Sequence, residues 1–316
     1  MVYAAVRRHR LVPGNTYTFP IFDPSTLGQS DVTVKFLGPD SVTVMGSEHA
    51  ATKVAVTFKG STQTAWISDD GDLLKEQGLL GITMEKADPR TALAGIETGK
   101  APDILDLSAI DTNVDIASPE RVKKLVAELE GVDIDGFDLS GGRQKLSGNT
   151  VSVEQQALSP LPRIRRISDT RRFSEALSPG PFVQSGHPKI QALAEEITNP
   201  NATLLENAEK IVFWIYDNIA KQPVVSVPDA ISTLEQKKGD CNEHAVLLAA
   251  VARAAGIPAE IEAGVAYLDG RFFYHAWNRL FVGEWVTVDS ALGQFPADAT
   301  HIRFVTGAAG NQTELI

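Results

Sequence analysis

A capped helix followed by three short strands, in the last third of the chain, constrains the fold more than any other feature of the sequence. Asp240 is a favourable N-cap residue, and Glu243 follows it at the spacing of a capping box. Gly256 suits the position just after a last helical turn. The pattern therefore predicts a helix from about residue 241 to residue 255.

Three strands are predicted to follow this helix. They are AEIEAGVAYL at 259–268, RFFYHAWNRLFV at 271–282 and WVTVDS at 285–290. Asp269-Gly270 and Gly283-Glu284 provide the residues of tight turns between them. Short turns join antiparallel neighbours, so we expect one antiparallel sheet packed beside the helix.

The only cysteine of the chain, Cys241, occupies the first turn of the predicted helix. The positive end of the helix dipole stabilises a thiolate there. The free backbone N–H groups of the same turn can hold a developing oxyanion. Cys241 is therefore either a nucleophile or, as the alternative, an inert buried thiol.

A nucleophilic thiol needs a base and an acceptor that orients the base, and His275 and Asp289 on the predicted strands offer both. A two-residue loop between the two strands would pair Asn278 with Asp289, which would put His275 and Asp289 on opposite faces. A three-residue loop or a bulge instead pairs Trp277 with Asp289 and makes His275 a diagonal neighbour on the same face. A Cys-His-Asp site therefore requires a three-residue loop or a bulge at 282–284.

The net charge of −11 provides no electrostatic basis for binding nucleic acid or an acidic membrane surface. No apolar run reaches the roughly 18 residues of a membrane-spanning segment. One cysteine forms neither an intramolecular disulfide nor a four-cysteine zinc site. We therefore expect no metal and no cofactor.

The first residues, MVYAAVRRHRLVPG, lack the apolar core of a signal peptide. We expect a cytoplasmic protein, or a periplasmic or extracytoplasmic one if an export segment was removed.

Composition divides the chain into three parts. Residues 1–160 contain short β-branched and aromatic segments between turn residues, which predicts a β-rich accessory domain, with one amphipathic helix at 118–129. Residues 161–187 are rich in proline and arginine, as expected of a linker or an extended segment. Residues 188–316 return to helices and then strands, so we expect the domain that carries Cys241 there.

The motifs in this last part resemble those of a known family. GDCNEHA at 239–245 is followed by RAAGIPA at 253–259, YHAW at 274–277 and WVTVDS at 285–290. Together, residues 239–303 resemble the core of the transglutaminase-like superfamily, in its bacterial branch. Ser290 stands where this family often has proline, a difference that does not touch the chemistry. The first part of the chain resembles the curved half-barrel sheets of exported bacterial proteins.

The resemblance implies a papain-like α+β fold in which Cys241 is the nucleophile, His275 the general base and acid, and Asp289 the residue that orients the imidazole. The implied reaction is acyl transfer on an amide of a protein or peptide substrate, which is the implied partner. It passes through a thioester and is completed by water as hydrolysis or by an amine as cross-linking. The backbone N–H of Cys241 and a side chain upstream would hold the oxyanion. Gln222 and Gln236 are both candidates for that side chain.

Three further residues are expected to line the pocket. They are Asp240, His244 and Trp277. His244 follows Cys241 at the spacing of half a metal site, but a helix residue bonded near the site is the favoured interpretation. Trp277 shares a face with His275 and either forms a wall of the pocket or simply packs.

Two other functions are compatible with the motifs. A catalytically silent module of the same fold would bind peptides or cell-wall partners, although such a module has no use for all three of Cys241, His275 and Asp289. An amine acetyltransferase of related fold would use an acyl-coenzyme A donor. No basic cluster that could hold its phosphates is evident near the three residues.

Overall fold

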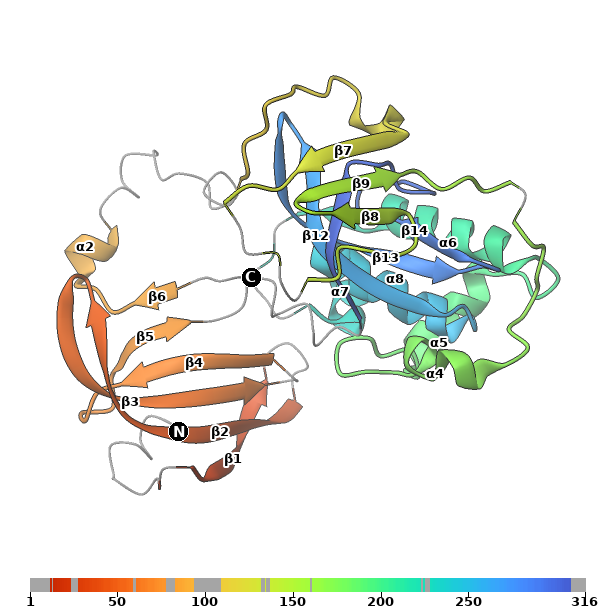
Figure 1. Ribbon diagram of the computed structural model, residues 1–316. Helices are drawn as coiled ribbons and strands as arrows, with labels where there is room; N and C mark the ends of the chain where they lie inside the picture. Colours follow the sequence, from red (N-terminus) through yellow and green to blue (C-terminus); the bar gives the residue numbers. More distant parts are fainter. Residues whose placement is uncertain are drawn as a thin grey trace. The chain divides into compact units, whose positions relative to one another are not determined.

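The computed structural model describes residues 12, 14–23, 28–58, 61–77, 83–93, 109–131, 134, 137–159, 161–222, 224 and 228–307. Two compact units make up the chain, Met1–Asp103 and Ile104–Leu315 (Figure 1). Residues 1–11, on which the expectation about an export signal depends, lie outside the described residues.

The first unit is built on one antiparallel sheet in which each strand pairs with the next along the chain. Its strands are β1 (Thr16–Asp23), β2 (Gly28–Val44), β3 (Ser47–Phe58), β4 (Ser61–Ile67), β5 (Leu73–Gln77) and β6 (Thr83–Glu85), and the short helix α2 (Pro89–Leu93) follows. The long strands β2 and β3 curve (Figure 1), and their register shifts between Phe36 and Gly38. The β-rich character predicted for this part of the sequence is confirmed. The prediction of short strands between turn residues is wrong for β2, which continues through Gly38-Pro39-Asp40 because these residues pair with β3.

The predicted helix at 118–129 is wrong. A 3₁₀ turn at Pro119–Arg121 leads instead into strand β7 (Lys124–Glu128), which pairs with β9 (Thr150–Glu154) in a sheet of order β7-β9-β8 with β8 at Gln144–Ser147. Leu125 and Ala127 are half-buried while Val126 between them is exposed, which is the two-residue period of a strand. Pairing with β9 overrides the helical spacing of the apolar residues.

This small sheet belongs to the second unit, so the division of the chain falls near residue 103 and not near 160. Val151 and Val153 of β9 are buried in one cluster with aromatic and aliphatic side chains from much later in the chain, namely Tyr267, Phe272, Ile302 and Phe304. Gln144 also donates from Nε2 to the carbonyl of Arg303 at 2.8 Å and accepts from its N–H at 2.8 Å. Residues after about 104 are thus part of the unit that holds Cys241.

The second unit has a helical layer against a four-stranded antiparallel sheet of order β14-β13-β12-β15. Its helices are α4 (Ser174–Leu177), α5 (Pro188–Ile197), α6 (Leu204–Asn218), α7 (Ala230–Gln236) and α8 (Cys241–Ala254). Two-residue strands β10 (Ala220–Lys221) and β11 (Lys238–Gly239) pair in parallel, and the sheet strands are β12 (Ala259–Leu268), β13 (Arg271–Phe281), β14 (Trp285–Val288) and β15 (His301–Gly307). This is the α+β arrangement expected from the sequence.

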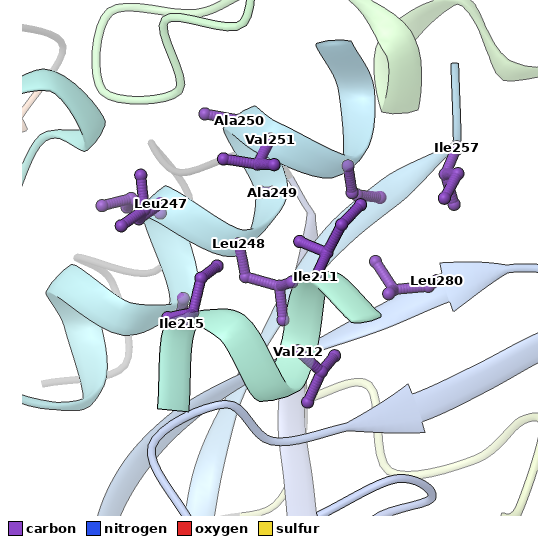
Figure 2. Close-up of a cluster of buried hydrophobic side chains, with 14 of the residues drawn as sticks. Ile211, Val212, Ile215, Leu247, Leu248, Ala249, Ala250, Val251, Ile257 and Leu280 are labelled. Atoms are coloured by element: carbon purple, nitrogen blue, oxygen red, sulfur yellow. The ribbon is translucent and has the colours of Figure 1, made fainter. Parts of the chain in front are cut away.

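Helix α8 lies at the centre of the main core. Leu247, Leu248 and Val251 pack with Ile211 and Ile215 of α6, together with Ile257, which precedes β12, and Leu280 of β13 (Figure 2). Alanines at 245, 249, 250 and 252 have at most 1% of their surface exposed. Small side chains allow the helix to approach its neighbours closely, so the position of Cys241 is fixed by packing on several sides.

The β13–β14 turn has the three-residue loop that a Cys-His-Asp site requires. Phe281 pairs with Trp285 and Asn278 with Val288, which leaves a three-residue loop at 282–284. One step further along this register, Asp289 stands opposite Trp277. His275 and Asp289 therefore share a face of the sheet, as predicted.

In the part of the chain that the structure describes, no helix combines the length and the apolar character needed to cross a membrane.

At Gly264 the backbones of strands β12 and β15 approach each other closely. Gly264 pairs with His275 on one side and with Arg303 on the other, where the register shifts next to Ala263. A Cβ atom at 264 would lie 2.0 Å from the carbonyl oxygen of Ile302. Only glycine therefore lets β15 lie this close to the strand that pairs with His275.

We expect Gly264→Ala to lower the free energy of unfolding by about 1–3 kcal/mol or more, because the methyl group meets rigid backbone. Gly186→Ala is the matched control, since its Cβ would meet nothing within 4 Å and its φ is not in the left-handed region. Urea denaturation of the two variants tests this expectation. Equal stability of the two variants would contradict this account of Gly264.

Candidate active site

The first turn of α8 presents Cys241 half-exposed, and its capping box is confirmed. The Asp240 carboxylate accepts from the N–H of Asn242 at 2.9 Å, and the N–H of Asp240 donates to Glu243 at 3.0 Å. The Glu243 side chain lies directly on Gly239, where an added Cβ would come within 2.2 Å of it. Gly239, Asp240 and Glu243 are thus requirements of this tight helix start.

The Glu243 carboxyl is 4% exposed. Burial, reinforced by the neighbouring Asp240, raises the pKa of Glu243 to about 8. Burial therefore favours the protonated form of this carboxyl near neutral pH.

Three polar side chains bind helix α8 to the sheet that carries the histidine. Asn278 on β13 is fully buried and donates to the carbonyl of Ala245 at 3.0 Å. Tyr274 lies on the same face of β13 as Asn278, and its hydroxyl donates to Asn242 Oδ1 at 3.1 Å. Ser290 donates from its hydroxyl to the carbonyl of His244 at 3.4 Å. These bonds fix the start of the helix relative to His275.

His275 is hydrogen-bonded through Nε2 to Asp289 Oδ2 at 2.6 Å. This leaves Nδ1 as the ring nitrogen available to the Cys241 thiol. Burial lowers the pKa of His275, but the Asp289 carboxylate and the hydrogen-bonded Cys241 thiol outweigh this effect and raise it to about 9. The imidazole is therefore protonated at neutral pH.

The Asp289 carboxylate is fully buried and accepts four hydrogen bonds. Oδ1 accepts from the backbone N–H groups of Ala291 at 2.7 Å and Leu292 at 3.0 Å, and Oδ2 accepts from His275 and His301. Burial alone would raise the pKa of Asp289, but the two histidines lower it well below its usual range. Asp289 thus stays ionised and holds the His275 ring in one orientation.

His301, for which the sequence suggested no role, lies at the same site. Its Nε2 is 3.0 Å from Asp289 Oδ2, and its Nδ1 is 3.1 Å from Asp298 Oδ1. The only sequence signal was that His301 and Asp298 both belong to the stretch, residues 239–303, that resembles the family. Their connection to Asp289 depends on β15 pairing with β12, which local sequence does not reveal.

Trp277 is 1% exposed and therefore packs within the site instead of lining open space. Its ring stacks on His275 with centroids 5.9 Å apart and meets His301 edge-on at 5.1 Å. Its Nε1 donates to the buried Glu262 at 2.7 Å. Of the two interpretations of Trp277, the structure favours packing, and the packed ring stacks against the imidazole of His275.

The other predicted site residues lie around the start of α8. His244 is buried, with Nδ1 bonded to the carbonyl of Asp240 at 2.7 Å, and Asp240 is half-buried. Gln222 is exposed, and its N–H donates to the carbonyl of Gly239 at 3.0 Å, beside the turn that leads to the cysteine. Gln236 is exposed in the last turn of α7.

Among the described residues, one group could bring three metal-ligating atoms together: His275, Asp289 and His301, with these atoms within 4.8 Å of one another. In the structure the same atoms are engaged in hydrogen bonds at 2.6 and 3.0 Å. His275 and His301 each direct a ring nitrogen at Asp289 Oδ2, so the three side chains form one hydrogen-bonded cluster.

Residues 191–290 match the model of the transglutaminase-like superfamily. This part of the chain belongs to that superfamily. The matched range runs from α5 through α8 to the residue after Asp289, so it contains all three residues expected to act. The chain finds no match among curated proteins.

Solved structures also align with the chain. One is a protein from Cytophaga hutchinsonii provisionally described as a cysteine protease, at 23% identity over 50% of this chain and 55% of that one, with a TM-score of 0.39. The periplasmic domain of TgpA from Pseudomonas aeruginosa bound to ethylmercury aligns at 25% identity over 46% and 56%, with a TM-score of 0.33. A second structure of the same domain aligns at 18% identity over 89% and 95%, with a TM-score of 0.34. The chain aligns with little more than half the length of the first two.

The raised pKa of His275 predicts a dependence of stability on pH. The unfolded value is about 6.5 and the folded value about 9, so the protonated ring stabilises the fold below pH 6.5, and this contribution is lost as the pH rises through 9. We expect the free energy of unfolding of the wild type to fall over this window by on the order of 2–3 kcal/mol more than that of His275→Gln. Urea titrations at several pH values measure the difference, and parallel curves would contradict the raised pKa.

Proposed function

We propose that this chain catalyses thiol-dependent acyl transfer on protein or peptide amides, with Cys241, His275 and Asp289 as the reacting group. The observation that carries the proposal is the buried His275–Asp289 bond of 2.6 Å through Nε2, because it leaves Nδ1 for the thiol at the start of α8. The family match to residues 191–290 supports the same class of chemistry.

The proposed reaction begins with the proton of Cys241 on His275 Nδ1. The thiolate attacks the carbonyl carbon of a carboxamide, either a glutamine side chain or a peptide bond, and the carbonyl becomes an oxyanion. His275 then gives its proton to the leaving nitrogen, so the C–N bond breaks and a thioester remains on Cys241. His275 next takes a proton from water or from an amine, which attacks the thioester and releases an acid or a new amide.

The oxyanion is held by the free N–H groups of the first turn of α8 and by a side chain from upstream. Gln222 is the better placed of the two candidates, because its backbone N–H is bonded to Gly239 of β11, two residues before Cys241. Gln236 is separated from β11 by the left-handed residue Lys237, which ends α7. We therefore propose Gln222 as the side-chain donor.

Alkylation of Cys241 tests whether the thiol is activated. Because a protonated imidazole stabilises a neighbouring thiolate, we expect wild-type protein to react with iodoacetamide already at pH 6, and His275→Ala to react appreciably only at alkaline pH. Rates measured from pH 5 to pH 9 by intact-protein mass spectrometry distinguish the two cases. Identical profiles that rise only near pH 8.5 would instead favour the silent peptide-binding module.

Turnover is tested with glutamine-containing peptides, with and without a labelled primary amine. Mass spectrometry distinguishes peptide cleavage, side-chain deamidation and amine incorporation. We expect Cys241→Ala to abolish every product, and Asp289→Asn to lower kcat by about 10²-fold to 10⁴-fold.

The matched control for turnover is His49→Gln, which changes an exposed histidine of the first unit and should keep wild-type rates. Products that persist in Cys241→Ala would rule out the thioester route.

A further inference from the structure

His301 has no exposed side-chain surface and faces a carboxylate with each ring nitrogen. Nε2 lies 3.0 Å from Asp289 Oδ2 and Nδ1 lies 3.1 Å from Asp298 Oδ1. A neutral imidazole donates from one nitrogen only, and its second nitrogen would then present a lone pair to a carboxylate oxygen. Both contacts are favourable only when the ring carries two protons.

Both carboxylates are themselves held in the ionised form. Asp289 accepts from two backbone N–H groups and from His275, as described above. Asp298 is 2% exposed and accepts from the N–H and the hydroxyl of Thr300 at 2.7 Å each and from Gln294 Nε2 at 2.7 Å. An ionised carboxylate only accepts hydrogen bonds, so His301 must be the donor in both contacts.

We propose that His301 is a buried imidazolium and a positioning residue, which holds the Asp289 carboxylate against His275 and thereby extends the Cys-His-Asp site by a second histidine and a second aspartate. This inference rests on the proposed function where it concerns catalysis, whereas the protonation state of His301 does not depend on it.

The charges around His301 alternate. His275 and Asp289 lie on one side and Asp298 on the other, and Arg143 donates to the carbonyls of Asp298 at 2.6 Å and of His301 at 3.4 Å. Burial lowers the pKa of His301, but Asp289 and Asp298 raise it by more. The pKa of buried His244 is instead lowered, chiefly by burial.

The proposed imidazolium has a consequence for His275. The two imidazole rings lie 5.8 Å apart, so the positive charge on His301 opposes the protonation of His275. Without it, the fully ionised Asp289 would hold the His275 proton more tightly. His301 therefore keeps the pKa of His275 within a range where the ring can still release its proton to a leaving amine.

The protonation state is measured directly by NMR on protein with ¹⁵N-labelled histidine. The chain has six histidines, and loss of one set of ring signals in His301→Gln assigns the residue. We expect both ring N–H groups of His301 to be present at pH 8, and Asp298→Asn to move their loss to lower pH. A single N–H at pH 8, as in a neutral ring, would overturn the proposal regardless of whether Cys241 is reactive.

The positioning role is measured by comparing Cys241 alkylation by iodoacetate and by iodoacetamide from pH 6 to pH 11. The anionic reagent is attracted by a protonated His275 and the neutral one is not, so the ratio of the two rates falls as His275 loses its proton. We expect the midpoint of this fall to move upward by about one pH unit in His301→Gln. The control His49→Gln should keep the wild-type midpoint.

The two experiments separate this proposal from the proposed function. A merely structural role of His301 predicts slower alkylation at every pH with an unchanged midpoint, and that result would overturn the positioning role. If wild-type Cys241 behaves as an ordinary thiol with no change in the rate ratio, the proposed function and the positioning role both fail, and the NMR signals still decide the protonation of His301.

Discussion

The buried carboxylate of Asp289 is the group on which the rest of the site depends. An isolated carboxylate without exposed surface would be strongly unfavourable, and it would take up a proton. Here four donors compensate for the lost water, two from the backbone just after β14 and two from histidines on different strands. This set of bonds fixes the orientation of His275, and through it the nitrogen that faces Cys241.

The fold supplies this arrangement through a few local requirements. The three-residue loop at 282–284 sets the parity that puts Asp289 and His275 on one face. Glycine at 264 lets β15 approach β12, which brings His301 to the carboxylate. On the other face of β13, Asn278 holds helix α8 by its Ala245 carbonyl, so the thiol and the imidazole are positioned by separate elements that share one strand.

Much of this could be predicted from sequence, because the relevant signals are local. The limits of α8 and its capping box follow from neighbouring residues. The length of the β13–β14 loop does not, because a two-residue loop was also compatible with the sequence, and three residues were expected only if Cys241, His275 and Asp289 form one site. Features set by distant contacts could not be predicted in this way. Strand β7 has helical spacing but pairs with β9, and residues after 104 join the second unit through contacts with β15. His301 reaches Asp289 only after the sheet has formed.

The central claim is that Cys241 forms a covalent acyl intermediate while His275 transfers the proton. The most direct measurement is intact-protein mass spectrometry after acid quench of wild-type protein mixed with peptide amide substrates. The account predicts a mass gain equal to the acyl group, mapped to Cys241, and no such adduct in His275→Ala. Product formation in the wild type with no acyl group on Cys241 at any quench time, or an adduct on another residue, would contradict it.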